Sequence, residues 1–330
     1  MIEQTIDHID NNQVSDLSAP DFLCVILGPT ASGKTALGVA LAERLFGEII
    51  SIDSRQVYRG MDIGTGKDLS SYRDIPYHLI DIQEPHDRYD ISQFKVDFHH
   101  AFTKVVSKGK VPIAVGGTGL YMHTLLLAQP YTQVPVDESL RQQLLPLDKI
   151  TLIQRLENYQ IPANFKIDQS SHKRLIRAIE ILEQLKAGYQ PVEEKTRYKP
   201  IIFGLNPSVD ARRQSISERL TSRLNEGLIE EVEQLLMQGL SHNDLQYFGL
   251  EYKYSSLYLL GELDKSSFYT KLETEIHRYA KRQMTFFRKM EKDGIKIHWL
   301  DAVDTAERLD AIERIIKKDH PKGLDSPFSF

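Results

Sequence analysis

The sequence predicts an α/β fold in which a parallel β-sheet is flanked by helices, and two observations carry this prediction. Apolar segments of strand length alternate with segments of helical apolar spacing through the first third of the chain. A glycine-rich loop, residues 28–35, stands between the first such strand and the first such helix. This alternation is typical of parallel sheets with helices on both faces, and ligands bind such sheets at the carboxyl ends of the strands.

The expected elements of the first part of the core, residues 21–122, follow from this alternation. The strands are expected at residues 22–27, 48–53, 78–82 and 111–115, and the helices at residues 35–46 and 92–107. Gly28, Asp53 and Gly116 each stand at the carboxyl end of an expected strand. We therefore expect these three residues to converge at one edge of the sheet.

The rest of the chain predicts a small helical insertion followed by the completion of the core. Residues 123–199 are polar and helical in pattern, and turn residues interrupt them. Residues 200–320 return to the core, with strands expected at 201–205 and 295–300, two or three long helices over about 209–238 and 266–292, and a final helix at 303–318. The ends of the chain, residues 1–20 and 321–330, are expected to be a disordered tail and a loose tail.

Composition excludes several classes of protein. The 330 residues are 41% hydrophobic and 26% charged, as in an ordinary globular protein, and the net charge of −5 by itself disfavours a nucleic-acid partner. The single cysteine, Cys24, excludes an internal disulfide and a cysteine-based metal cluster. There is no membrane-spanning apolar run, and residues 1–20 lack the features of a signal peptide. We expect a cytoplasmic protein with no membrane partner.

The glycine-rich loop matches the phosphate-binding pattern G-x-x-x-x-G-K-[ST], which predicts a P-loop NTPase-like core. Its members are Gly28, Pro29, Thr30, Ala31, Ser32, Gly33, Lys34 and Thr35. Backbone N–H groups and the start of the following helix attract phosphate there, while Lys34 contacts the terminal phosphates and the Thr35 hydroxyl can hold Mg²⁺. The pattern leaves open whether the phosphate belongs to a nucleotide.

Two further strand ends carry residues suited to chemistry. A carboxylate at Asp53 can hold the metal or act as a general base, although Asp is also a common helix cap. The second glycine-rich turn, Gly116–Gly119, can bring the backbone close to a ligand or can be no more than a tight turn. The strand before this turn has no acidic end, which disfavours a motor-type ATPase.

Basic residues gather in two places despite the negative net charge. Residues 173–177 place Lys173, Arg174 and Arg177 on one helix face, and residues 278–288 mix basic and aromatic side chains. Both patterns suit contacts to RNA phosphates and bases. Taken alone, the first cluster is better explained as a solvated helix face, and core aromatics explain part of the second. The histidines have no metal-ligand spacing.

Taken together, these segments resemble the tRNA dimethylallyltransferase family. The resemblance runs through most of residues 28–300. It rests on the phosphate loop and on Ser51–Tyr58, Met61–Thr65, His78–Ile82, Gly116–Tyr121, Arg174–Ala178 and Tyr279–Gln283. It implies transfer of a dimethylallyl group from dimethylallyl diphosphate to the exocyclic amine of the adenosine 3′ to a tRNA anticodon. The phosphate loop would then bind the prenyl diphosphate and not ATP.

The resemblance also implies roles for individual residues. Asp53 would be the general base, Lys34 would stabilise the leaving diphosphate, Thr35 would hold Mg²⁺, and Arg219 would lie near the diphosphate. The residues implied to contact the tRNA anticodon stem-loop are Asp53, Ser54, Arg55, Gln56, Thr118, Arg141, Lys173, Arg174 and Arg177. The target base must leave its stack to reach a buried carboxylate, so base flipping is expected. The protein is expected to be a monomer.

This sequence departs from the family pattern in places. The insertion is expected to be shorter than usual, Glu251 stands in place of a glycine and Tyr254 in place of Glu or Gln, Ser170–Ser171 replaces Asn-Asp, and Phe286 replaces a common Trp. These changes leave alternatives open. The acceptor could be a free adenine nucleotide, the protein could be a small-molecule kinase, or it could be a non-catalytic RNA-binding relative. The presence of Lys34, Thr35 and Asp53 argues against the last.

Overall fold

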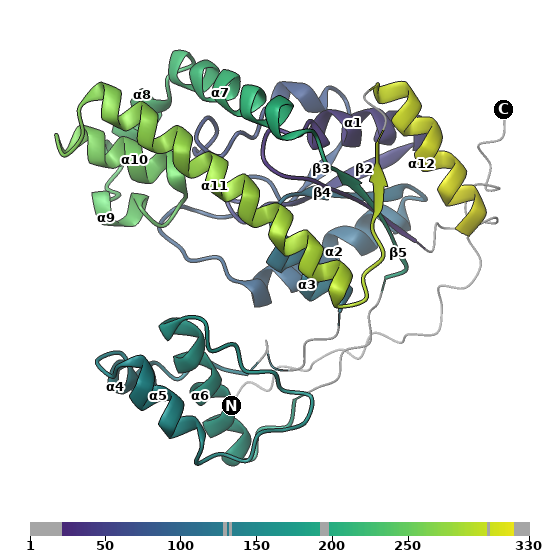
Figure 1. The fold of residues 1–330 in the computed structure, drawn as a ribbon. Coiled ribbons are helices and arrows are strands. Elements are labelled where there is room, and N and C mark those ends of the chain that lie inside the picture. Colours follow the sequence, from purple (N-terminus) through teal and green to yellow (C-terminus); the bar gives the residue numbers. More distant parts are fainter. Residues whose placement is uncertain (1–21, 128–130, 132–133, 192–197, 302–303, 320–330) are drawn as a thin grey trace, which may run out of the picture. The chain divides into compact units, whose positions relative to one another are not determined.

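The computed structural model of this chain describes residues 22–127, 131, 134–191, 198–301 and 304–319. The tails expected at 1–20 and 321–330 lie outside the described residues. The chain divides into two compact units, the core unit (Met1–Leu126 with Tyr198–Phe330) and the insertion unit (Leu127–Arg197) (Figure 1). No helix in the described part of the chain is long and apolar enough to cross a membrane.

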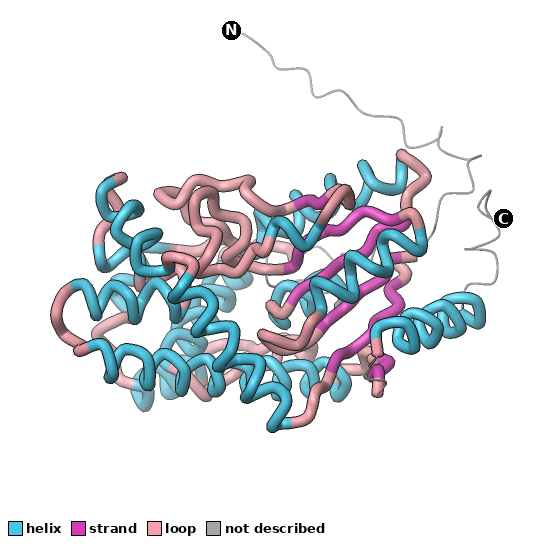
Figure 2. The backbone as a smooth tube through the Cα atoms, turned by 90° about the horizontal axis from the view of Figure 1, so that it is seen from above, coloured by secondary structure: helices cyan, strands magenta, loops and turns pink. Residues whose placement is uncertain are grey.

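A six-stranded sheet in the order β3-β2-β4-β1-β5-β6 forms the centre of the core unit, and every neighbouring pair is parallel. Its strands are β1 Leu23–Leu27, β2 Gly47–Ile52, β3 Tyr77–His78, β4 Val111–Gly116, β5 Pro200–Leu205 and β6 His298–Leu300. Central β1 pairs with β4 on one side and β5 on the other, so that Val25 lies between Ala114 and Ile202. The strands lie side by side between helices (Figure 2). The predicted fold class is confirmed.

Helices cover both faces of the sheet and so bury its central strands on both sides. The apolar residues of α1 (Lys34–Leu45) and α12 (Thr305–Asp319) share one core cluster with the strands. On the other face α2 (Ile91–Ser107) packs on β2 and β4, and α3 (Gly119–Leu126) packs between α2 and α11 (Lys265–Lys292). Asp90 begins α2 with a capping box closed by Gln93.

A second group of helices extends the core unit beside the sheet and forms its own apolar core. Its members are α7 Val209–Asn225, α8 Leu228–Met237, α9 His242–Leu245, α10 Leu250–Leu259 and the first half of α11. Ile216 and Leu220 of α7 pack against Phe268, Leu272 and Ile276 of α11 in this cluster. This packing directs one face of α7 toward the phosphate loop.

The structure corrects an expected strand and divides an expected helical segment. The strand expected at 78–82 is wrong beyond His78, because Leu79 and Asp81 adopt left-handed backbone conformations with φ of 63° and 55°. The helical segment at 209–238, for which the sequence left the number of helices open, is two helices, because Gly227 interrupts it with φ of 103° and becomes the N-terminal cap of α8. A periodic apolar pattern continues across both breaks, so periodicity alone does not locate them.

In its described residues the insertion unit contains the helices α4 (Glu138–Leu144), α5 (Lys149–Leu156) and α6 (His172–Lys186). Leucine and isoleucine side chains of all three meet in a separate apolar cluster. Ser171, one of the departures from the family pattern, is the N-terminal cap of α6 and accepts a hydrogen bond from the Arg174 backbone N–H at 3.3 Å. The substitution therefore keeps a residue type that caps helices well.

Candidate active site

The phosphate loop joins the end of β1 to the start of α1, as the sequence predicts. Gly33 caps the helix with φ of 80°, and Ala31 also adopts a positive φ, of 58°. A Cβ atom on Gly28 would lie 2.5 Å from Ser32 Oγ, so a larger residue there would displace the Ser32 hydroxyl. Ser32 Oγ is itself buried and has no hydrogen-bond partner among the described residues. The loop therefore presents a helix N-terminus and an unsatisfied hydroxyl at one point.

Gln283 of α11 joins the phosphate loop to the second glycine-rich turn. Its side-chain oxygen accepts a hydrogen bond from the Thr30 N–H at 2.8 Å, and its amide nitrogen donates to the Gly117 carbonyl at 2.9 Å. The side chain is 7% exposed, and a Cβ on Gly117 would lie 2.5 Å from its nitrogen. Sequence reasoning saw Gln283 only as the end of a basic motif, and the available signal of this role was an amide on the otherwise apolar face of α11, with Ala280 and Phe287.

Asp53 lies at the carboxyl end of β2, one residue beyond Ile52. Its Oδ1 accepts the Arg55 backbone N–H at 2.9 Å, which directs the segment that follows. The adjacent Ser54 N–H donates to Thr118 Oγ1 at 3.3 Å, so the carboxylate and the second glycine-rich turn are held together. A Cβ on Gly116 would overlap the Ile52 carbonyl at 2.1 Å, which explains the glycine at this close approach.

A cavity of about 390 Å³ collects these groups at the carboxyl ends of the strands. Its walls include Thr30, Lys34, Thr35, Asp53, Ser54, Arg55, Gln56, Gly116 and Arg219. A smaller hollow of about 270 Å³ on the other side of the loop shares Lys34, Thr35 and Arg219 with it. Thus the basic, hydroxyl and carboxylate groups expected at the diphosphate lie within one continuous region of the core unit.

Positive charge is concentrated beside the phosphate loop. Burial, together with the neighbouring Arg219, lowers the pKa of Lys34 to about 8, while Asp53 opposes the shift. Burial and the nearby Arg223 likewise lower the pKa of Arg219. Arg219 donates to the Gly66 carbonyl at 3.2 Å and to Asp68 Oδ2 at 3.0 Å. Crowded, desolvated cations of this kind favour the binding of an anion.

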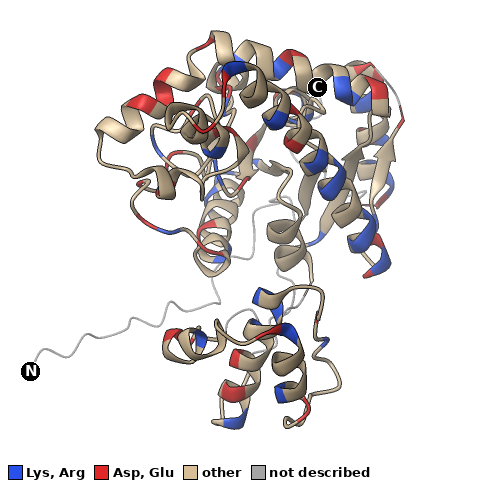
Figure 3. Ribbon diagram, turned by 60° about the vertical axis from the view of Figure 1, so that its left-hand side comes forward, with Lys and Arg blue, Asp and Glu red and all other residues tan. Residues whose placement is uncertain are grey.

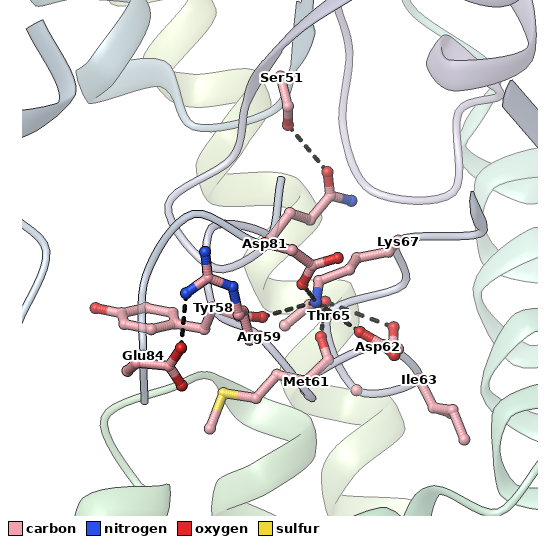
Figure 4. Close-up of polar contacts among 12 residues, drawn as sticks. Ser51, Tyr58, Arg59, Met61, Asp62, Ile63, Thr65, Lys67, Asp81 and Glu84 are labelled. Carbon is pink, nitrogen blue, oxygen red and sulfur yellow. Dashed lines mark hydrogen bonds and ion pairs between the residues drawn. The ribbon is translucent and has the colours of Figure 1, made fainter. Parts of the chain in front are cut away.

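The wall formed by residues 62–67 is held by two charged side chains. Glu231 of α8 accepts the backbone N–H groups of Asp62, Ile63 and Gly64 at 2.8, 2.7 and 2.9 Å. The Tyr252 hydroxyl donates to the same carboxylate at 2.7 Å. Lys67 is fully buried, and its Nζ binds the Tyr58 carbonyl and the carboxylates of Asp62 and Asp81 (Figure 4).

Aromatic and basic residues line another part of the same cavity. The Tyr247 ring in the cavity wall lies under two guanidinium groups, that of Arg55, which also lines the cavity, at 4.5 Å from the ring centre, and that of Arg88 at 4.0 Å. Tyr279 of α11 is 38% exposed, with Arg282 5.9 Å from its ring centre. Exposed aromatic rings paired with guanidinium groups can stack on unpaired bases. The sequence indicated Tyr279 but gave no signal for Tyr247.

The basic residues predicted to contact tRNA from the insertion unit have partners within that unit. Arg141 binds the fully buried Glu180 with two hydrogen bonds, at 2.8 and 2.9 Å, and Arg177 reaches the same carboxylate at 3.4 Å. Arg174 binds Asp168 at 2.6 Å, while Lys173 is exposed. Acidic and basic residues are interspersed along the ribbon (Figure 3). Contact of these residues with tRNA stays a prediction.

Two departures from the family pattern lie close to the glycine-rich loops. Glu251 of α10 lines the same cavity as Lys34 and forms an ion pair with Arg223 at 2.8 Å. Phe286 of α11 covers the second glycine-rich turn, since a Cβ on Gly119 would lie 2.4 Å from its ring. The altered segment at residues 250–254 is therefore part of the cavity that holds the phosphate loop.

The described residues contain no group of three or more His, Cys, Asp or Glu side chains that could bind a metal. Oxygen donors near the loop are instead the Thr35 hydroxyl and the Asp53 carboxylate, both in the cavity wall. A cation such as Mg²⁺ typically takes one or two protein ligands and completes its shell with phosphate oxygens and water.

The fold and the cavity define a class of protein, namely one with a P-loop NTPase-like core whose candidate site lies at the carboxyl edge of its sheet. Comparison with known proteins narrows this class. A model of the family described as IPP transferase matches residues 56–290, and one described as isopentenyl transferase matches residues 22–73. The chain belongs to the IPP transferase family.

Individual relatives agree with this assignment. The chain is 44% identical over 308 residues to tRNA dimethylallyltransferase 1 of Geotalea daltonii, covering 93% of this chain and 98% of that protein. It is 48% identical over 303 residues to tRNA dimethylallyltransferase 2 of Porphyromonas gingivalis, covering 89% and 98%. These matches confirm the predicted family and the predicted type of enzyme, a prenyl transferase.

Solved structures give the same result for the fold. The crystal structure of a tRNA isopentenylpyrophosphate transferase from Staphylococcus epidermidis superposes with a TM-score of 0.65 at 32% identity, covering 90% of this chain and 99% of that one. A eukaryotic dimethylallyltransferase acting on tRNA superposes with a TM-score of 0.71, covering 94% and 81% of the two chains. At 22% sequence identity, this comparison supports a shared fold and nothing further.

Proposed function

We propose that this protein transfers a dimethylallyl group from dimethylallyl diphosphate to the exocyclic amine of the adenosine 3′ to a tRNA anticodon, with release of diphosphate. The observation that carries the proposal is the single cavity that holds Lys34, Thr35, Asp53 and Arg219. A phosphate loop supplies a diphosphate site, and a carboxylate at the next strand end supplies a base.

The reaction follows from the placement of these charges. The C–O bond of the donor breaks as the C–N bond to the amine forms, and the bonding electrons leave with the diphosphate. Lys34, Arg219 and the loop N–H groups stabilise the negative charge that develops on the leaving group. Asp53 orients the amine and takes the proton that it loses. The products are therefore the prenylated amine, the diphosphate and one proton, which account for all atoms of the two substrates.

Thr35 is the residue that would hold Mg²⁺, because its hydroxyl lies in the cavity wall next to Lys34. When bound, the ion supplies Lewis-acid stabilisation of the diphosphate oxygens. The chain itself provides the loop amides, the cations on α1 and α7, and the carboxylate. Tyr247, Tyr279 and their arginine neighbours lie where a flipped base could stack.

The test is a transfer assay with a matched pair of variants. The protein is incubated with Mg²⁺, labelled dimethylallyl diphosphate and unmodified tRNA, with AMP and ATP as acceptors in parallel. Asp53→Asn keeps an oxygen for the Arg55 N–H but removes the base, so kcat should fall about 10²- to 10⁴-fold while tRNA affinity stays within a few-fold. Asp53→Ala should show the same fall in kcat and the same near-normal tRNA affinity. Near-normal turnover in either variant would contradict the mechanism, and label in AMP or ATP alone would make the acceptor a free nucleotide.

A further inference from the structure

Helix α7 carries two arginines toward the phosphate loop, of which the family resemblance assigns only Arg219. Arg223 lies one helical turn further along the same face and is 7% exposed. Both side chains line the cavity that contains Lys34 and Thr35. Arg223 is thus a nearly buried cation in the cavity wall, and the reaction described above assigns it no role.

The two guanidinium groups converge on one backbone position. A Cβ atom on Gly66 would lie 1.7 Å from Arg223 Nη2 and 2.2 Å from Arg219 Nη2. Glycine at position 66, where φ is 63°, leaves the space that both groups enter. Two like charges brought this close repel each other, and an anion between or beside them relieves that repulsion.

Carboxylates hold each arginine from behind but leave hydrogen-bonding capacity unused. Asp68 binds Arg219, and Glu251 binds Nη1 of Arg223 at 2.8 Å, with the Gly64 carbonyl 3.5 Å from the same nitrogen. The Arg223 Nε–H is buried and has no partner among the described residues. Such an unsatisfied donor costs free energy unless a ligand accepts from it.

Glu251 is the residue that fixes the position of Arg223. It stands where the family pattern has glycine, and its carboxylate is the partner that holds a nearly buried arginine in the cavity wall. Guanidinium groups bind phosphate through paired N–H donors, and a fixed carboxylate orients them before the ligand arrives. Arg223 and Glu251 therefore form a unit aimed at an anionic ligand.

We propose that Arg223 is a second arginine that binds the leaving diphosphate, and that Glu251 positions it. This inference rests on the proposed function and deepens it. As the donor C–O bond breaks, the charge on the diphosphate is shared between Lys34, Arg219 and Arg223. The competing explanation is that Arg223 and Glu251 only tie α7 to α10, with no contact to substrate.

The experiment separates these two explanations by removing both charges together. Arg223→Met alone would leave the Glu251 carboxylate beside the diphosphate and weaken binding by repulsion, whatever the normal role of the arginine. The double variant Arg223→Met/Glu251→Gln avoids this, because it removes the pair without leaving a lone charge. Arg223→Lys keeps the charge but not the paired donors. Arg44→Met, which removes an arginine from an exposed ion pair with Asp310, is the matched control.

Binding of inorganic diphosphate with Mg²⁺ to the full chain is measured by calorimetry, beside the donor KM and the kcat of transfer. The double variant should bind diphosphate about ten- to a hundredfold more weakly, with a raised donor KM and a lowered kcat. Arg223→Lys should fall between it and the unaltered protein, while Arg44→Met should match the unaltered protein. The lysine variant preserves the ion pair's charge, so it gives an answer even where the double variant folds poorly.

Unchanged diphosphate affinity and donor KM in Arg223→Lys and in the folded double variant would overturn the inference and leave only the structural tie. That outcome differs from failure of the proposed function, in which the unaltered protein itself would transfer no label to tRNA. Weaker diphosphate binding by the double variant, together with normal tRNA affinity, would establish Arg223 as a ligand of the leaving group.

Discussion

Replacing Lys67 with Met removes a fully buried charge on which three parts of the chain converge. Its Nζ donates to the Tyr58 carbonyl at 2.7 Å and to Asp62 at 2.6 Å, and it also binds Asp81 (Figure 4). These bonds close the segment that begins after Asp53 and carries Arg55 and Gln56 into the cavity. Met fills a similar volume without the charge, so the variant tests the ionic contacts more than the packing.

The expected cost follows from the exposure of the three partners. Removing one member of a buried ion pair typically costs about 3–5 kcal/mol, because the other charge is left unpaired. Here the side chains of Asp62 and Asp81 are 54% and 32% exposed and can be hydrated in part. The carbonyl of fully buried Tyr58 loses its bond from Nζ. We therefore expect a loss of about 2–4 kcal/mol in the free energy of unfolding.

Urea unfolding followed by tryptophan fluorescence measures this loss. Trp299 is the one tryptophan of the sequence and lies in β6, so its signal reports on the core unit. The control is Arg59→Met, which breaks the Arg59–Glu84 ion pair of the same segment. Both of its side chains are more than half exposed, so it should cost less than about 1 kcal/mol. A loss in Lys67→Met no larger than in this control would refute the reasoning.

Two further predictions concern the metal and the acid limit of stability. In a magnesium titration, Thr35→Ala should raise the Mg²⁺ concentration for half-maximal transfer about tenfold or more, whereas Thr35→Ser should stay close to the unaltered protein. Equal behaviour of the two variants would exclude the Thr35 hydroxyl as a metal ligand. Burial alone would raise the pKa of Glu48, but hydrogen bonds from Lys108 and His78 outweigh it and hold the pKa below the ordinary 4.5. The stability that this ionised group contributes is present above pH 4.5 and is lost as the pH falls through the lower folded pKa. Glu48→Gln should therefore flatten the decline in unfolding free energy in that pH window. An unchanged decline in this variant would contradict the assigned role of Glu48.

The sequence predicted the elements whose signals are local. The phosphate loop joins a buried strand to a helix as expected, because its glycines and its flanking apolar runs are contained in one short stretch. The family resemblance, now confirmed, rested on several such stretches in order. The apolar pattern did not predict the ends of elements that are set by left-handed backbone conformations. The apolar periodicity of residues 209–238 hid the break at Gly227, and the left-handed residues Leu79 and Asp81 shortened β3.

What the sequence determined by itself is a loop of the phosphate-binding pattern, a carboxylate at a strand end and, through the family resemblance, the class of enzyme. Only the tertiary structure decided which distant residues complete the site. Gln283 reaches the phosphate loop from 253 positions away, and Glu251 meets Arg223 across two helices. Such contacts depend on how helices pack against one another over long separations in sequence. Their strength comes from burial and from hydrogen bonds that form only once the core has closed, and no local pattern records them.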